Sequence, residues 1–359
     1  MGRRFEQAAL ALALSVAGLA LLPLAASASG GTWSLTADMQ TISGFNSAIR
    51  LQDGRVLVVG FICCSRSIAE VYDPSSATWT RQGDLNRPRG VQTMTLLRDG
   101  RVLVAGGEPA PPHNTSELFD PVKGAWTLTG ELNVSRRNAQ AAMLPDGRVL
   151  VAGGLGSPSG LRDAEIYDPD SGEWTLTGSM VVGRFFFGMT SLQDGTVLAA
   201  GGFYDLNSSE LFDPATGTWT QVGDMSEGSE APLHLLNDGR VLAIHRPTAD
   251  LYDPSTQSWR ATAGPRGDHF DTVLSDGRVL GSGSTGPVLT SEIFDPLTET
   301  WQETGPMQMF RQFHSATLLD DGTVLAAGGG NEGPPCNPEG GCTFYPLRSA
   351  EIFTPDDPN

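Results

Sequence analysis

The stretch that decides the fold reads Leu144-Pro145-Asp146-Gly147-Arg148-Val149-Leu150-Val151-Ala152-Gly153-Gly154, followed by Ala164-Glu165-Ile166-Tyr167-Asp168-Pro169 and by Trp174. The pattern recurs, and all seven tryptophans of the chain belong to it. Its copies, aligned on the glycine of the Asp-Gly pair, follow one another at steps of 46, 47, 48, 44, 38 and 45 residues, at Gly54, Gly100, Gly147, Gly195, Gly239, Gly277 and Gly322. A period of this length indicates a solenoid, a propeller or an array.

Each copy predicts four short strands. An Asp-Gly pair between two apolar runs predicts a hairpin with a two-residue turn, because Asp and Gly tolerate the positive φ that such a turn requires. A short third strand stops at Asp-Pro, and a fourth strand carries the Trp. One four-stranded sheet cannot bury both of its faces, so neighbouring sheets must stack, with the Trp and the Tyr or Phe residues between them.

The two ends of the repeat array predict how a ring closes. The seventh copy ends at Ala350-Glu351-Ile352-Phe353-Thr354-Pro355 without a Trp strand, whereas Thr32-Trp33-Ser34-Leu35 is a Trp strand with no copy before it. Joining the two removes both open sheet edges. The sequence therefore predicts an all-β fold, a seven-bladed β-propeller of four-stranded antiparallel blades whose last blade is closed by the N-terminal strand.

Two charged columns also recur with the blades. Because buried carboxylates need a partner, we expect the acids of one column to pair with the arginines of the other and to serve structure. The acids are Glu70, Glu117, Glu165, Glu210, Asp250, Glu292 and Glu351, and the arginines, eleven residues before the turn glycine, are Arg89, Arg136, Arg184, Arg266 and Arg311.

The composition bounds the partners. The 359 residues include 44 Gly and 24 Pro, which suits a turn-rich β protein, and carry a formal net charge of −18. Lys and Arg drive binding to nucleic acids and anionic membranes, so we expect neither as a partner. Residues 29–359 contain no second apolar spanning segment, charge run or low-complexity linker, so we expect them to form one propeller domain and a monomer.

The first 28 residues predict a secretory signal peptide. Arg3 and Arg4 precede an apolar run from Ala8 to Leu22, and Ala26-Ser27-Ala28 is a small-x-small cleavage pattern. The run is too short and too poorly flanked for a stable membrane span. We expect a secreted, periplasmic or cell-envelope protein, exported by the general secretory route, with the twin-arginine route as the alternative.

The four cysteines lie in two loops, as Cys63-Cys64 and as Cys336 with Cys342. Export makes disulfides plausible. The simplest pairing is Cys336 with Cys342, which leaves Cys63 and Cys64 free or in a strained vicinal bond. Cross-links between the two loops are the alternative, because the first and seventh blades are neighbours in a closed ring.

The repeats resemble kelch repeats over the whole of residues 29–359. The seventh copy is also similar to the propeller of galactose oxidase and related bacterial proteins. The residues that carry this second resemblance are Arg311-Gln312-Phe313-His314-Ser315, Asp321-Gly322-Thr323-Val324-Leu325-Ala326-Ala327-Gly328-Gly329-Gly330 and Ala350-Glu351-Ile352-Phe353-Thr354-Pro355.

The resemblance to galactose oxidase implies a copper site, which this sequence does not reproduce. That family uses a Tyr-His pair at the start of the seventh blade, a Tyr linked to a Cys from the first two blades, and a second His from a following domain. By position His314 matches the His, but Phe313 stands for the Tyr, Asn46 for the Cys and Val91 for the linked Tyr. One ligand is too few, so we expect no metal, no cofactor and no copper-radical oxidase activity.

Departures from the repeat plan are the better candidates for a site. The kelch resemblance places ligands on the face where loops enter the first strand and leave the second strand of each blade. The fifth copy deviates most, because His245-Arg246 replace glycines and Gly228 replaces the arginine. We predict a ligand-binding set on this face, formed by Asn46, Gln92, Glu230, His245, Arg246, Asp268, His269, His314 and Asn331. The alternative is a shortened fifth-blade loop whose side chains merely fill a gap.

The functional prediction is a secreted, non-catalytic binding module whose loop face contacts a carbohydrate or a protein partner. We assign no catalytic residue. One alternative is a carbohydrate-active hydrolase or lyase on the same face, built around Glu230, Asp268, His269 and His314. Another is a purely structural envelope protein. A ring of repeats supports many functions, so the fold itself does not choose among them.

Overall fold

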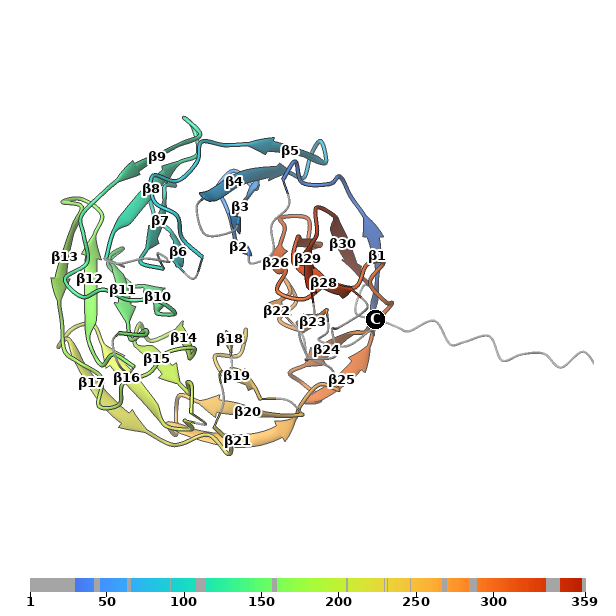
Figure 1. The fold of residues 1–359 in the computed structure, drawn as a ribbon. Coiled ribbons are helices and arrows are strands. Elements are labelled where there is room, and N and C mark those ends of the chain that lie inside the picture. Colours follow the sequence, from blue (N-terminus) through green and yellow to red (C-terminus); the bar gives the residue numbers. More distant parts are fainter. Residues whose placement is uncertain are drawn as a thin grey trace, which may run out of the picture.

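The computed structural model describes residues 30–41, 46–62, 66–90, 92–107, 114–156, 160–204, 206–228, 230, 232–245, 247–266, 270–283, 289–333 and 343–356. Seven four-stranded antiparallel sheets stand as blades around a central channel, the first strand of each blade innermost and the fourth outermost (Figure 1). Blades one to three consist of β2 (Asn46–Arg50), β3 (Val56–Ile62), β4 (Arg66–Asp73), β5 (Thr78–Arg81); β6 (Thr93–Leu96), β7 (Val102–Ala105), β8 (Ser116–Asp120), β9 (Ala125–Leu128); and β10 (Gln140–Met143), β11 (Val149–Ala152), β12 (Ala164–Asp168), β13 (Glu173–Leu176).

The remaining four blades repeat this plan. They consist of β14 (Gly188–Ser191), β15 (Val197–Ala200), β16 (Ser209–Asp213), β17 (Thr218–Val222); β18 (Leu233–Leu235), β19 (Val241–Ile244), β20 (Thr248–Asp253), β21 (Ser258–Ala263); β22 (Phe270–Val273), β23 (Val279–Ser282), β24 (Ser291–Asp295), β25 (Thr300–Glu303); and β26 (Ser315–Leu318), β27 (Val324–Ala327), β30 (Ala350–Pro355) with β1 (Gly31–Leu35).

Blade seven joins the two ends of the array. Strand β1 pairs antiparallel with β30, and Trp33 lies opposite Phe353 with 5.1 Å between the ring centroids. The N-terminal strand thus supplies the outer strand of the last blade, beside the C-terminal strand (Figure 1). The predicted seven-bladed propeller and its closure are confirmed.

The Asp-Gly hairpin differs from the prediction in one detail. In blade three, Leu144 N–H donates to Arg148 O and Gly147 N–H donates to Leu144 O, at 2.8 and 2.9 Å. The connection therefore has three residues, a type I turn followed by a glycine at φ +95°, and the predicted two-residue turn is wrong. The same two hydrogen bonds recur in blade one, where Gln52 stands at the position of Pro145, so the longer loop belongs to the repeat and its glycine takes the left-handed position.

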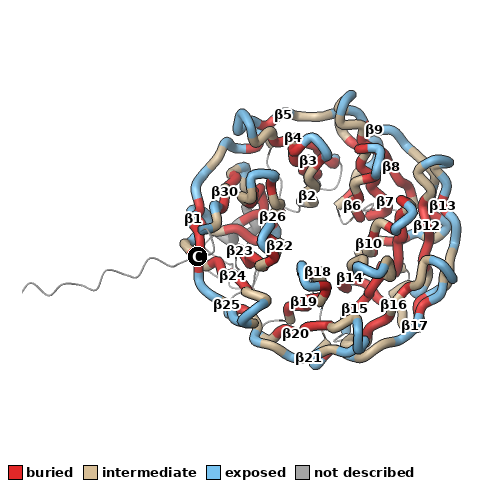
Figure 2. The backbone as a smooth tube through the Cα atoms, turned by 180° about the vertical axis from the view of Figure 1, so that it is seen from behind, coloured by how far each residue is buried: buried red, intermediate tan, exposed pale blue. Residues whose placement is uncertain are grey.

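The core lies between the blades. The two middle strands of each blade are mostly buried, whereas the outermost strand is largely exposed (Figure 2). The second strand of each blade is buried along four consecutive residues, as in Val149–Ala152. Each Trp leans on the aromatic residue of the third strand, as Trp174 does on Tyr167 at 5.0 Å. The repeated aromatics are packing, as the sequence predicts, because buried rings of this size contribute much of the apolar area.

Several indole N–H groups reach across to the preceding blade. Trp33, Trp174 and Trp259 donate to the hydroxyl oxygens of Ser291, Ser116 and Ser209, at 3.0, 3.1 and 2.9 Å. In blades one and three the serine position holds an alanine, Ala69 or Ala164, and the buried Nε1 atoms of Trp126 and Trp219 in the following blades find no acceptor among the described residues.

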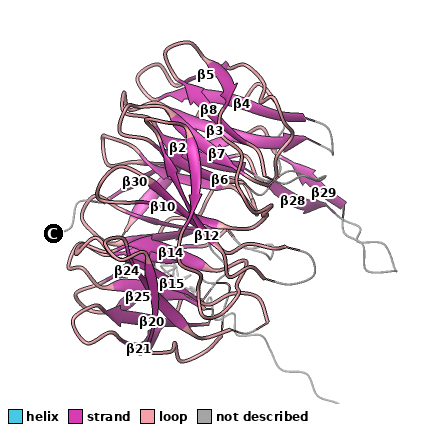
Figure 3. Cartoon of the chain, turned by 90° about the vertical axis from the view of Figure 1, so that its left-hand side faces the viewer, coloured by secondary structure: helices cyan, strands magenta, loops and turns pink. Residues whose placement is uncertain are grey.

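One feature departs from the repeat. A hairpin of β28 (Gly330–Gly333) and β29 (Thr343–Pro346) extends from blade seven at one end of the ring, as the side view shows (Figure 3). Cys63, Cys64, Cys336 and Cys342, and with them the predicted disulfide, lie outside the described residues. A search of the described residues for a helix long and apolar enough to cross a membrane found none.

Candidate functional site

The two ends of the ring differ in construction. The turn face carries the Asp-Gly and Asp-Pro turns, such as Asp53-Gly54 and Asp73-Pro74, which lie together. The loop face carries the segments that enter the first strands and leave the second strands. In blade four these two segments are joined, because Phe203 N–H donates to Phe185 O at 3.0 Å. This arrangement confirms the predicted common face for the two sets of loops.

A cavity of about 440 Å³ opens at the channel mouth on the loop face. Its lining comes from segments that enter the first strands of blades one to four, six and seven. These residues are Ser47, Gly90, Gln92, Asn138, Ala139, Gln140, Phe186, Phe270, Phe313 and His314. Because a cavity with a few polar groups among apolar ones is the usual form of a small-molecule site, we take this channel-mouth cavity as the candidate site.

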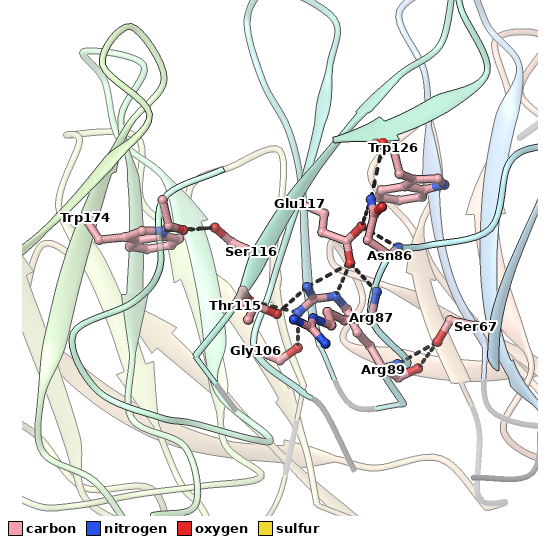
Figure 4. Close-up of polar contacts among 11 residues, drawn as sticks. Ser67, Asn86, Arg87, Arg89, Gly106, Thr115, Ser116, Glu117, Trp126 and Trp174 are labelled. Carbon is pink, nitrogen blue, oxygen red and sulfur yellow. Dashed lines mark hydrogen bonds and ion pairs between the residues drawn. The ribbon is translucent and has the colours of Figure 1, made fainter. Parts of the chain in front are cut away.

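Buried ion pairs hold the entering segments in place. In blade two the Arg89 guanidinium lies 2.9 Å from Glu117 Oε1 and also donates to the carbonyl oxygens of Gly106 and Thr115 (Figure 4). Glu117 in turn accepts the backbone N–H of Arg87 at 3.0 Å. One acid thus fixes the arginine and the start of its segment, which places Gln92 three residues further on.

The same pair recurs in three other blades. The distances are 2.7 Å for Arg136 and Glu165, 2.8 Å for Arg184 and Glu210, and 2.8 Å for Arg311 and Glu351. Burial lowers the pKa of Arg136, Arg184 and Arg311 from the usual value, and the glutamates only partly oppose this shift. The predicted structural pairing is confirmed in these four blades.

Blade six does not follow the predicted pairing. Arg266 reaches Glu303 Oε1 at 2.8 Å instead, with its side chain 82% exposed. Arg266 touches Glu292 only through its backbone N–H, which donates to Oε2. The reason is spacing, because Arg266 follows Trp259 by seven residues, whereas Arg184 follows Trp174 by ten. The prediction of an Arg266–Glu292 pair is therefore wrong.

Blade five replaces the arginine by a histidine from another strand. Gly228 leaves the arginine position empty, and His245, just after β19, puts its Nε2 2.8 Å from Asp250 Oδ2. Both side chains are buried. Burial opposes ionisation of Asp250, but hydrogen bonds from His245 and Ser226 outweigh it and lower the pKa of the carboxyl. This geometry favours the gap-filling interpretation of His245 over a ligand contact.

The polar part of the cavity consists mainly of side-chain amides. Gln92 presents a buried Oε1 that has no hydrogen-bond partner among the described residues. Asn138 and Gln140 add two more amides from blade three. His314 is buried, and its Nε2 lies 3.0 Å from Ser282 Oγ. Because buried polar groups are rarely left unpaired, the Gln92 oxygen marks a place where a ligand or water would be bound.

Aromatic rings form the rest of the lining. Phe270 packs edge-on against Phe313 and His314, at centroid distances of 5.9 and 5.0 Å. Phe186 and Phe313 have φ of +50° and +54°, and each is 41% exposed. Bulky residues rarely adopt this left-handed backbone conformation, and such strain tends to occur at functional sites.

The predicted site residues fall into four groups. Gln92 and His314 line the cavity. His245 lies in the blade-five pair, while Glu230 is exposed and partial desolvation raises the pKa of its carboxyl. For Asn46 and Asn331 the structure gives only the backbone, in β2 opposite Gly60 and in β28 opposite Tyr345. Arg246, Asp268 and His269 lie outside the described residues.

The aromatic and amide residues beside Gln92 and His314 were not predicted from the sequence. The run Phe185-Phe186-Phe187 was a usable signal, because three consecutive phenylalanines before a first strand depart from the repeat plan. A buried pair between blades five and six was not predicted either. His234 Nε2 lies 3.9 Å from Asp271 Oδ2, and neither carboxylate oxygen of Asp271 has a hydrogen-bond partner among the described residues.

The donor set does not fit the copper site that the resemblance implies. His314 Nε2 is within hydrogen-bond distance of Ser282, and Phe313 offers a phenyl ring where a phenolate oxygen would be needed. Within the described ranges, no group of three or more His, Cys, Asp or Glu side chains is placed to hold a metal ion. A copper ion needs more nitrogen and oxygen donors than these residues supply.

Comparison with known proteins agrees with this architecture. The kelch motif matches residues 136–181, from Arg136 to Val181, which include the four strands of blade three. A structural search finds a fungal alcohol oxidase of the AA5 family, solved in complex with copper, with a TM-score of 0.73 over 90% of this chain and 76% of the oxidase. Sequence identity is 20%, so this likeness shows a shared fold. No curated protein sequence matches the chain.

These findings define the protein as a kelch-motif, seven-bladed β-propeller with a galactose-oxidase-like fold.

Proposed function

We propose that the protein binds an uncharged carbohydrate in the channel-mouth cavity and acts as a non-catalytic binding module. The observation that carries this proposal is the buried Oε1 of Gln92, which has no hydrogen-bond partner among the described residues and lies in a cavity of about 440 Å³. A ligand hydroxyl group that donates to this oxygen would remove the cost of leaving it unpaired, which is about 1–3 kcal/mol.

The lining matches the two kinds of surface that a sugar ring offers. The edge of a sugar carries hydroxyl groups, which both donate and accept hydrogen bonds, and Gln92, Asn138 and Gln140 can do the same. The faces of a sugar carry C–H groups, which pack on aromatic rings such as Phe186 and Phe313. An entirely apolar ligand would leave the amides unpaired, and such mismatches lower affinity.

Charge favours a neutral ligand. None of the residues that line the described part of the cavity is Asp, Glu, Lys or Arg. The chain as a whole carries −18, and its field repels anions. A cationic ligand would be recognised by carboxylates, which this lining does not present. Neutral sugars satisfy both conditions.

The absence of catalysis is part of the proposal. Glycoside hydrolysis commonly needs a pair of carboxyl groups on either side of the bond that breaks. The channel-mouth lining has amides and rings at the described positions instead. We propose further that residues 1–28 direct export, so that the propeller meets its glycan outside the cytoplasm. Peptide sequencing of the exported protein should then begin at Ser29.

A thermal-shift screen of residues 29–359 against soluble neutral glycans, each with and without EDTA, tests the proposal. A specific ligand at a hundredfold excess over its Kd stabilises the fold by about 2.7 kcal/mol and raises Tm. Gln92→Ala should lose this shift, whereas Leu297→Ser, at a 93% exposed position on the turn face, should keep it. Absence of a shift with every glycan would overturn the proposal in favour of a protein partner. Release of reducing ends would overturn the non-catalytic role.

A further inference from the structure

Four aromatic side chains gather on the loop face of blade four, just outside the cavity. We call Phe185, Phe186, Phe203 and Tyr204 the aromatic platform. Phe185 is the buried base, with ring centroids 4.9 Å from Phe203 and 5.7 Å from Phe186. Phe203 continues to Tyr204 at 4.6 Å in an edge-to-face arrangement. The two loops on either side of β14 and β15 thus carry one connected set of rings.

The outer rings of the platform are exposed to solvent and contribute little to the core. Phe186 and Phe203 are each 41% exposed, and Tyr204 is 82% exposed. Tyr204 also has φ +69°. This backbone conformation is unfavourable for a residue other than glycine, and burial of the Tyr204 side chain does not offset the cost. Apolar side chains that gather on a surface, rather than stand singly, are typical of contact sites.

Backbone hydrogen bonds hold the platform in place. Phe203 N–H donates to Phe185 O at 3.0 Å, which joins the two loops of blade four. Phe186 N–H points toward Asn138 O at 3.4 Å, a longer contact with blade three. The backbones of Phe186 and Phe203 are therefore held before any ligand arrives, which lowers the entropic cost of binding to this surface.

Phe186 belongs both to the cavity lining and to the platform. A ligand that fills the cavity would therefore leave it past Phe186 and meet Phe203 and Tyr204 next. We propose that the platform is a second binding subsite, which takes the following units of an extended neutral polysaccharide whose first unit occupies the cavity. This inference rests on the proposed carbohydrate function and extends it from a single sugar to a chain.

The chemistry of the platform favours a neutral glycan chain over other extended ligands. Its exposed groups are two phenyl rings and a phenol, which offer flat apolar faces and one hydroxyl. An acidic polymer or an anionic membrane would need cationic side chains, whereas Arg184 behind the platform is fully buried and bonded to Glu210. A peptide chain is the competing occupant.

The test is calorimetric titration with cello-, xylo- and galacto-oligosaccharides, from the monosaccharide to the hexasaccharide. For the wild type, affinity should rise roughly tenfold once the chain is long enough to pass Phe186. The double variant Phe203→Ser, Tyr204→Asn should bind the short sugars unchanged and lose this rise. Asn is chosen at 204 because it tolerates positive φ. Val122→Ser, at a 94% exposed position on the turn face, is the matched control.

The outcomes separate the two proposals. If Gln92→Ala abolishes binding at every length while the platform variant leaves the length dependence intact, the platform inference is wrong and the cavity proposal stands. If the wild type binds sugars of all lengths equally, the platform inference is also wrong. If no oligosaccharide binds the wild type, both proposals are wrong.

Discussion

His245 Nε2 lies 2.8 Å from Asp250 Oδ2, and this contact stands where four other blades place an arginine on a glutamate. The histidine directly follows the second strand, whereas the arginine comes from the loop before the first strand. Residues at two positions far apart in the repeat therefore have the same role, because each donates a hydrogen bond to a buried carboxylate.

Removal of this donor should weaken blade five. In His245→Ala, Asp250 keeps the backbone and hydroxyl donors of Ser226, at 2.8 and 2.9 Å, but loses its imidazole partner. We expect the free energy of unfolding to fall by about 2 kcal/mol, the usual value for a buried hydrogen bond to a charged group. Urea unfolding measures this. His245→Gln, which can still donate, should lose less, and an alanine variant as stable as the wild type would show that the pair is not structural.

The arginine column offers its own control. Arg184→Ala leaves the fully buried Glu210 without its ion-pair partner and should cost about 3–5 kcal/mol. Arg266→Ala removes an arginine from the same sequence position, but its side chain is 82% exposed and should cost less than about 1 kcal/mol. Urea unfolding of the two variants side by side makes the comparison. Equal losses would contradict the assignment of the first pair as buried structure.

Blades five and six are also joined by an ion network that depends on pH. The hydrogen bond from Arg260 outweighs the desolvation of the carboxylate and, with Arg240, lowers the pKa of Glu299 from 4.5 to about 2. A depressed carboxyl pKa stabilises the fold above the unfolded-state value and loses this effect as pH falls through the folded-state value.

We therefore expect Glu299→Gln to be less stable than the wild type by about 1 kcal/mol at neutral pH, a figure that allows for screening at this partly exposed site. The difference should shrink as pH falls from 4.5 to about 2. Urea unfolding of both proteins across this range checks the prediction. Glu303→Gln, in an exposed pair with Arg266, is the control. A difference that stays constant with pH would contradict the linkage.

The unpaired indoles predict a stabilising substitution. Ala164 occupies the position where Ser209 accepts the indole N–H of Trp259, and Trp219 Nε1 is left without an acceptor among the described residues. Ala164→Ser should raise the free energy of unfolding by about 1 kcal/mol, and Ser209→Ala should lower it by a similar amount. Thermal unfolding of the two variants is the measurement. A fall in stability for Ala164→Ser would show that the site has no room for the hydroxyl group.

Much of the fold was predictable, because the same turn, strand and charge pattern occurs seven times in the sequence. The turn glycines from Gly54 to Gly322 fix seven hairpins, and the unmatched Trp33 strand predicts the closure with Phe353. The acid and arginine columns likewise predict Arg89, Arg136, Arg184 and Arg311 on their glutamates. The predicted Arg266–Glu292 pair was wrong because the copies were aligned on the turn glycine that follows the arginine. The distance from the preceding Trp instead sets where the arginine side chain emerges.

The site was less predictable, because it depends on which loops meet across the channel. Gln92 and His314 were found by their equivalent positions, and both line the cavity. Asn138 and Phe186 were missed, since their importance comes from their place beside Gln92 and Phe203 rather than from a motif. His245 was predicted as a ligand contact because it replaces a glycine of the repeat, and its pairing with Asp250 could not be read from the acid column, whose expected partners were arginines.

The central claim is that the channel-mouth cavity binds a neutral glycan through Gln92. The most direct measurement is calorimetric titration of the wild type and Gln92→Ala with the neutral glycan that gives the largest thermal shift. We predict saturable binding to the wild type with one site per chain and at least a tenfold loss of affinity in Gln92→Ala, which corresponds to about 1.4 kcal/mol. Equal affinity of the two proteins would contradict the claim and place the binding site elsewhere on the ring.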